Sequence, residues 1–134
     1  MIKTIYFIFF ACAFSLGLWA CTGNKKAEYK NLTSAQFEEL IKSDKVQLVD
    51  VRTLTEYTEG HIPGSLNINV KDSAGFPTAV DCLLNKEQEI AVYCRSGRRS
   101  RTAADILVKK GFIKVYNLDK GILNWMEEGR EVEK

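Results

Sequence analysis

Short apolar runs alternate with stretches of helical periodicity from about residue 32 to the end of the chain. Four short runs have the patterns of strands: the first and third below are apolar, as in buried strands, and the second alternates apolar and polar residues. They are VQLVDV, SLNINV, EIAVYC and KVYNL, over residues 46–51, 65–70, 89–94 and 114–118. Strands that alternate with helices form βαβ units. The pattern therefore predicts an α/β domain with a parallel sheet and helices on both faces.

The helical stretches carry recognisable start and stop signals. Thr33 and Gln36 have the spacing of a capping box, and Leu32 and Phe37 stand where a hydrophobic staple needs apolar residues. Further helical segments are predicted within residues 53–60, 76–86, 100–111 and 121–129. Gly111 is expected at the C′ position after the helix that begins near Ser100.

The chain begins with a segment that is typical of export rather than of the fold. Residues 4–20 carry no charge and follow a single Lys3, as in a secretory signal peptide; an uncleaved anchor helix is the alternative. The LWAC stretch ending at Cys21 resembles a bacterial lipobox. We therefore expect a signal peptide over residues 1–20, and a lipidated Cys21 with a polar tether over 21–31. The predicted product is an exported lipoprotein, in the periplasm or at the cell surface, that is held to a membrane by its lipid.

Charge and cysteine content narrow the function of the remaining domain, residues 32–134. Of the 19 basic residues only Lys3 lies within residues 1–20, which leaves 18 basic against 17 acidic residues in 21–134 and argues against a nucleic-acid partner. Cys82 and Cys94 have eleven residues between them and no Cys or His at ligand spacing, so no metal site is predicted. Cys82 is expected to be a buried free cysteine on a helix.

Cys94 is the candidate nucleophile. It ends a predicted buried strand, and ligands of open parallel sheets bind beyond the carboxyl ends of the strands. The following RSGRRS turn, residues 95–100, offers unpaired amides, a flexible Gly97 and three arginines, which together suit an anion and favour a thiolate. His61 is the single histidine and stands more than thirty residues away in sequence, so a Cys–His pair is not the favoured mechanism.

Three separated motifs resemble those of rhodanese-like sulfurtransferases. They are VDVRTLTEYTEGHIPGSLNI over residues 49–68, CRSGRRS over 94–100 and VYNLDKGILNW over 115–125. The resemblance implies a rhodanese-like α/β fold with a central parallel sheet of about five strands and helices on both faces. It also implies that Cys94 takes up a sulfane sulfur as a persulfide and passes it to a thiol or cyanide, without a metal or organic cofactor. The donor would be a small anion such as thiosulfate, bound by Arg95, Ser96, Gly97, Arg98, Arg99 and Ser100.

Four further residues are assigned a supporting part. Asp50 and Arg52 leave the strand where the family places a polar cluster, and Arg52 is predicted to pair with Glu56. His61 is expected in a turn, with direct contact to substrate as the less favoured alternative.

Other functions of such a loop remain open at this point. A phosphatase or arsenate reductase would need an arginine six positions after the cysteine, where this chain has Ser100. A non-catalytic persulfide carrier, or a redox-sensing module that docks to a partner, would also keep Cys94. An exported thiolate is prone to oxidation, so we expect either a reducing partner protein or a persulfide resting state.

Overall fold

The computed structural model describes residues 28–134. The predicted signal peptide, its cleavage site and Cys21 lie outside these residues. The strands are β1 Lys30–Leu32, β2 Gln47–Asp50, β3 Leu66–Asn67, β4 Ile90–Tyr93 and β5 Val115–Leu118. The helices are α1 Ser34–Ile41, α2 Leu54–Glu59, α3 Gly75–Leu83, α4 Arg98–Lys109 and α5 Gly121–Glu127.

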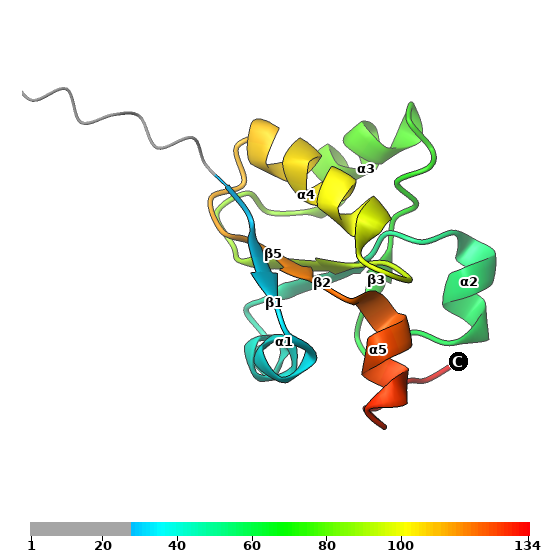
Figure 1. Cartoon of the computed structure of the whole chain (residues 1–134). Helices are drawn as coiled ribbons and strands as arrows, with labels where there is room; N and C mark the ends of the chain where they lie inside the picture. The colour runs from blue at the N-terminus through cyan, green and yellow to red at the C-terminus, as the bar shows by residue number, and fades with distance from the viewer. Residues whose placement is uncertain (1–27) are drawn as a thin grey trace, which may run out of the picture.

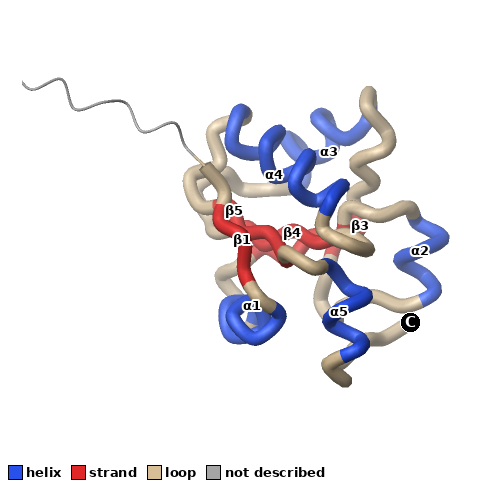
Figure 2. The backbone as a smooth tube through the Cα atoms, viewed as in Figure 1, coloured by secondary structure: helices blue, strands red, loops and turns tan. Residues whose placement is uncertain are grey.

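All neighbouring strands pair in parallel, in the order β1-β5-β4-β2-β3. Helices α3 and α4 cover one face of the sheet, α1 and α5 cover the other, and α2 lies beyond the carboxyl ends of the strands (Figures 1 and 2). The predicted five-stranded parallel α/β fold is thus confirmed. Because every strand runs in the same direction, the start of β1 lies at the opposite end of the sheet from Cys94, which follows β4.

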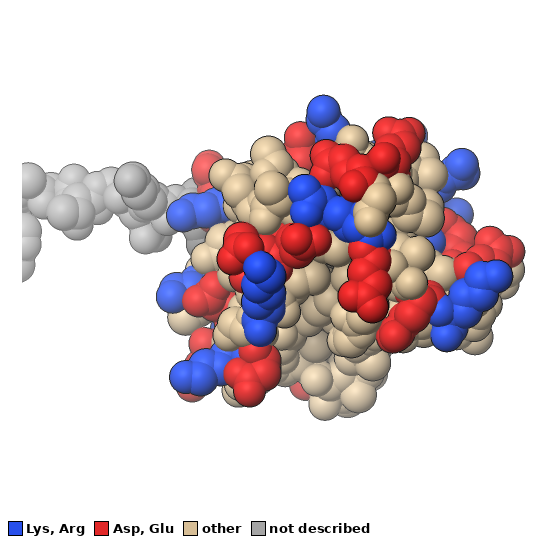
Figure 3. All heavy atoms as spheres, turned by 90° about the horizontal axis from the view of Figure 1, so that it is seen from below, with Lys and Arg blue, Asp and Glu red and all other residues tan. Residues whose placement is uncertain are grey.

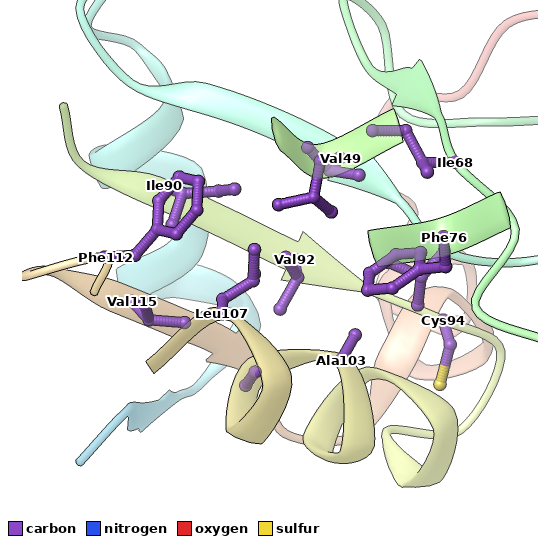
Figure 4. Packing of buried hydrophobic residues seen from close by; sticks show 13 residues of the cluster. Val49, Ile68, Phe76, Ile90, Val92, Cys94, Ala103, Leu107, Phe112 and Val115 are labelled. Carbon is purple, nitrogen blue, oxygen red and sulfur yellow. The ribbon is translucent and has the colours of Figure 1, made fainter. Parts of the chain in front are cut away.

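Two apolar cores hold the layers together. On one face Val49, Val92 and Val115 pack against Ala103 and Leu107 of α4 and against Phe76 and Val80 of α3, and Cys94 closes this cluster at its end (Figure 4). On the other face Phe37 packs edge-to-face against Tyr93 and Trp125. The sheet is therefore buried on both sides, which agrees with the continuous apolar runs of its strands.

The strands differ from prediction at the two edges of the sheet. Residues 65–70 were predicted as a strand, but β3 covers only Leu66–Asn67, after which Ile68 and Val70 still donate to the backbone of residues 50 and 51. Strand β1 was not predicted, and its Lys30 and Asn31 had been assigned to the polar tether. A three-residue edge strand with two exposed polar residues has no apolar periodicity, so pairing with β5 creates it.

The helix signals were confirmed in α1 and α4. Thr33 and Gln36 form both hydrogen bonds of the capping box. Gly111 has a φ of 97° and follows α4 with the two backbone bonds of a Schellman motif, from Gly111 to Val108 and from Phe112 to Leu107. The prediction of a buried Cys82 is wrong, because α3 buries Phe76 and Val80 and this turns Cys82 towards solvent. Cys82 and Cys94 are both free.

The surface of the domain mixes charges of both signs. On the face seen from below, acidic and basic side chains surround an area that carries neither (Figure 3). Within residues 28–134 no helix has the length and apolar character to cross a membrane. The same residues contain no group of three or more His, Cys, Asp or Glu side chains that could hold a metal ion.

Candidate active site

The thiol of Cys94 lies at the end of β4, enclosed by the turn that follows it. Its sulfur accepts a hydrogen bond from the Gly97 amide at 3.1 Å and another from the Ser100 hydroxyl at 3.3 Å. The Gly97 carbonyl oxygen also lies 3.1 Å from the Ser100 hydroxyl, so the single hydroxyl proton has two acceptors, the sulfur and this carbonyl oxygen. The residue is 1% exposed. Two hydrogen-bond donors, the Gly97 amide and the Ser100 hydroxyl, therefore point at one sulfur atom.

Gly97 is required by its conformation and by its surroundings. Its φ of 96° belongs to the left-handed region, which side chains other than glycine adopt at a cost. A β-carbon at this position would collide with the carbonyl oxygen of Asp119, in the turn between β5 and α5. The turn after Cys94 is therefore pressed directly against the turn after the neighbouring strand.

Helix α5 holds the cysteine turn by its backbone. The Ile122 amide donates to the Cys94 carbonyl at 2.9 Å, and the Leu123 amide donates to the Arg95 carbonyl at 3.1 Å. The first amides of a helix have no partner inside the helix, so the cysteine turn satisfies two of them. This contact needs Gly121, with a φ of 68°, because a β-carbon there would collide with the backbone of Arg95. Gly121 lies within one of the three motifs but was assigned no part; its position at the first residue of a predicted helix was the available signal.

The helix after Cys94 begins earlier than predicted. It was expected near Ser100, whereas α4 starts at Arg98, with Gly97 at the N-cap position and the Arg101 amide donating to the Gly97 carbonyl. No Ser, Thr, Asp or Asn stands at that cap, so the usual start signal is missing. As a result the predicted loop residues Arg98, Arg99 and Ser100 form the first helical turn, and Ser100 faces inward to the sulfur.

The three arginines of the turn have different surroundings. Arg95 and Arg98 are exposed. Arg99 instead forms a bidentate ion pair with Glu56 of α2, at 2.7 and 2.8 Å. The hydrogen bonds from Arg99 lower the pKa of Glu56 to about 2, although partial burial acts in the opposite direction. Glu56 in turn raises the pKa of Arg99, so the pair stays ionised and ties α2 to α4.

The predicted pair between Arg52 and Glu56 is wrong, because each has another partner. The Arg52 guanidinium lies 2.6 Å from the carboxylate of Asp50, which is completely buried, and it also donates to the Gly60 carbonyl at 2.7 Å. Asp50 and Arg52 stand two residues apart at the end of β2, close enough for both to turn inward together. A buried charge needs such a partner, so this pair secures the turn after α2.

His61 is engaged in the same turn and contacts neither Cys94 nor its loop. Its Nδ1 lies 2.9 Å from the Tyr57 carbonyl oxygen, its Nε2 lies 3.3 Å from Glu133, and its ring stacks on Tyr57. Its backbone forms an antiparallel bridge with Glu133 near the carboxyl end of the chain. His61 is thus placed as a turn residue, the favoured of its two predicted parts.

The fold and the cysteine turn together agree with one family. The model of the rhodanese-like domain matches residues 33–128. The chain belongs to the rhodanese-like domain family.

Three similar proteins each match about two thirds or more of this chain. The thiosulfate sulfurtransferase GlpE of Shewanella oneidensis is 33% identical over 101 residues, which are 75% of this chain and 96% of that protein. YrkF of Bacillus subtilis, whose name describes a sulfur carrier protein, is 37% identical over 90 residues, 66% of this chain and 46% of that longer protein. The crystal structure of a rhodanese-related protein from Thermoplasma volcanium is 30% identical, with a TM-score of 0.64, and the match covers 78% of this chain and 98% of that one.

We predict that the ion pair between Glu56 and Arg99 stabilises this rhodanese-like domain at neutral pH. The folded pKa of Glu56, about 2, lies below its usual 4.5, so the contribution is complete above pH 4.5 and disappears as the pH falls through 2. Glu56→Gln should lower the free energy of unfolding at pH 7 by about 1–2 kcal/mol. This value lies between the contribution of an exposed ion pair and that of a buried hydrogen bond to a charged group, because the pair is partly buried.

Urea denaturation of both proteins between pH 7 and pH 2 measures this difference. The gap between Glu56→Gln and the unmodified protein should shrink towards the acid end. As a matched control, Glu59→Gln changes an exposed glutamate of the same helix and should leave the pH dependence unaltered. A gap that stays constant with pH would contradict the assignment.

Proposed function

We propose that this rhodanese-like domain is a sulfurtransferase that moves sulfane sulfur from an anionic donor such as thiosulfate to a thiophilic acceptor through a persulfide on Cys94. The observation that carries the proposal is the sulfur of Cys94 with two hydrogen-bond donors, the Gly97 amide and the Ser100 hydroxyl, directed at it. Membership of the family and the likeness to proteins named thiosulfate sulfurtransferase support it.

The reaction divides into two displacements at sulfur. The Cys94 thiolate attacks the outer sulfur of thiosulfate, the bond between the two sulfur atoms of the donor breaks, and sulfite leaves with the electron pair. A thiol or cyanide then attacks the outer sulfur of the persulfide, and the electron pair of the breaking bond returns to Cys94. The free thiolate carries its charge on the Cys94 sulfur, at which the two donors are directed, whereas the persulfide carries its charge on the outer sulfur. This is ping-pong covalent catalysis.

The arginines are given separate parts in this proposal. Arg95 and Arg98 are exposed beside the sulfur, where they attract the donor anion. Arg99 keeps α2 in place through Glu56, which neutralises its charge. The backbone from Arg95 to Ser100 encloses the sulfur. Asp50, Arg52 and His61 act indirectly, by fixing the turns around the site.

A phosphatase or arsenate reductase fits this site less well. Position six after the cysteine holds Ser100, whose hydroxyl is directed at the sulfur, and the preceding Arg99 is bound to Glu56. A tetrahedral oxyanion would therefore lack the guanidinium that must lie within about 3 Å of its oxygens.

A non-catalytic carrier is the second candidate function. Its support is the likeness to YrkF, which is named for sulfur carriage, over 46% of that protein. Carrier and enzyme share the persulfide and differ in the rate at which the sulfur is passed on.

We also propose that the domain is exported and tethered to a bacterial membrane through a lipid on Cys21, after removal of residues 1–20. The LWAC stretch supports this. The Cys94 site lies at the end of the sheet opposite to the start of β1, the first strand of the chain. In such a compartment a reducing partner protein or a persulfide resting state would protect Cys94 from oxidation.

Incubation with thiosulfate is expected to add one sulfur atom to Cys94, about 32 Da by intact mass, and cyanide should then remove it with formation of thiocyanate. Cys94→Ser should gain no sulfur, whereas Cys82→Ser should load like the unmodified protein, because Cys82 is an exposed cysteine outside the site. Loading without discharge to any acceptor would favour the carrier. Turnover of aryl phosphates without thiosulfate loading would overturn the sulfurtransferase proposal.

Ser100→Ala should slow sulfur loading by about 10- to 100-fold, since a hydrogen bond to a charged group contributes about 1.5–3 kcal/mol. The first-order rate of persulfide formation at saturating thiosulfate, followed by mass spectrometry, measures this effect. Ser96→Ala removes an exposed hydroxyl from the same turn and serves as the control, with a rate close to that of the unmodified protein. Equal rates for the two variants would show that the Ser100 hydroxyl does not act on the sulfur.

Cys21→Ala in the full chain should abolish incorporation of a labelled fatty acid in a bacterial host and release the protein from the membrane fraction. Cys12→Ala lies inside the expected leader and is the control, with labelling retained. Continued lipid labelling of Cys21→Ala would exclude Cys21 as the lipid site.

A further inference from the structure

A groove of about 450 Å³ lies between α2 and α5, beside the turn that follows Cys94. Arg95, the residue after the nucleophile, lines it together with Glu59 of α2 and with Leu123 and Met126 of α5. We call this surface the α2–α5 groove. The sulfur-transfer steps described above make no use of it.

The apolar wall of the groove is exposed. Leu123 is 37% exposed and Met126 is 43% exposed, and their spacing of three places them on the same side of α5. Neighbouring exposed apolar side chains next to a reactive group mark a surface for an apolar part of a ligand or partner. Methionine suits such a surface because its flexible thioether adapts to different shapes.

The charges of the groove are arranged unevenly. Arg52 and Glu56 also line the groove. Asp50 neutralises Arg52, and Arg99 neutralises Glu56. Glu59 and Arg95 form no ion pair with any residue in 28–134, so these two charges are available to a ligand. Arg95 directly follows the nucleophile, and Glu59 is the last residue of α2. A ligand that uses the whole groove therefore combines an apolar group, a positive charge opposite Glu59 and a negative charge, such as an acceptor thiolate, near Arg95.

We propose that the α2–α5 groove binds a polypeptide segment that carries the acceptor cysteine, with an apolar side chain on Leu123 and Met126 and a lysine or arginine opposite Glu59. The proposal rests on the proposed function and names the class of its acceptor. Cyanide has neither group, and a small free thiol would leave the apolar wall exposed. A peptide fits because its side chains supply both features, and 450 Å³ is within the range of binding sites for organic ligands.

The transfer balances without any further reagent. The acceptor thiolate attacks the outer sulfur of the Cys94 persulfide, and the bond to the Cys94 sulfur breaks with its electron pair left on that sulfur. The acceptor cysteine becomes a persulfide, and Cys94 returns as a thiolate. No atom is oxidised beyond the exchange of one sulfane sulfur between two thiols.

The test measures the rate at which thiosulfate-loaded protein passes its sulfur to each of two acceptors at equal thiolate concentration. One acceptor is a capped peptide with one cysteine flanked by two leucines and a lysine, and the other is free cysteine. The peptide should react at least about tenfold faster, as expected if one apolar contact is gained. Met126→Gln should reduce this advantage several-fold, with unchanged thiosulfate loading and cyanide discharge. Ile113→Gln is the matched control, since Ile113 is 66% exposed at the other end of the sheet, before β5.

A charge exchange provides a second readout that does not depend on the apolar variants. Glu59→Lys should slow discharge to the lysine peptide and accelerate discharge to the same peptide with glutamate in place of lysine. Equal rates for peptide and free cysteine, or variants that leave the peptide rate unchanged while loading is normal, would overturn the groove proposal alone. Failure of the unmodified protein to load sulfur would overturn this proposal together with the proposed function.

Discussion

The contact between the cysteine turn and the start of α5 is the constraint on which the site depends. Two carbonyls of the turn, those of Cys94 and Arg95, accept the amides of Ile122 and Leu123. With its carbonyls held outward in this way, the turn directs the Gly97 amide and the Ser100 hydroxyl at the sulfur. The close approach is possible only because Gly97 and Gly121 have no side chain. One backbone interface thus organises Cys94, the two donors to its sulfur and the neighbouring groove.

Two ion pairs determine which charges remain available around this turn. Asp50 with Arg52, and Glu56 with Arg99, bind α2 and its following turn to the rest of the domain. Each pair neutralises one arginine, so neither Arg52 nor Arg99 adds net positive charge to the surface around the cysteine turn. The free charges, Arg95 and Arg98, lie on the side of the turn that faces solvent. The electrostatics of the site thus follow from the packing of α2 as much as from the number of arginines in the turn.

Much of this could be predicted along the chain, because the decisive signals are local. Apolar runs such as residues 89–94 mark buried strands, and Thr33 with Gln36 marks a helix start. Cys94 at the end of a strand, followed by Gly97 and three arginines, already marks the turn that the structure places beyond β4. The errors concern features that depend on distant residues. Strand β1 exists through its pairing with β5, and the exposure of Cys82 depends on which face of α3 meets the sheet.

The sequence by itself determined the α/β class and the place of Cys94 and its turn at the end of a strand, since periodicity and strand ends are properties of neighbouring residues. Only the tertiary structure decided the partners. Arg99 meets Glu56 across 43 positions, and Gly121 meets Arg95 across 26, because folding brings α2, α4 and α5 to one end of the sheet. From the sequence alone, a charged side chain has several possible partners of opposite charge, and burial decides which one it meets. Asp50 is fully buried and requires Arg52 as its partner, which leaves Glu56 for Arg99.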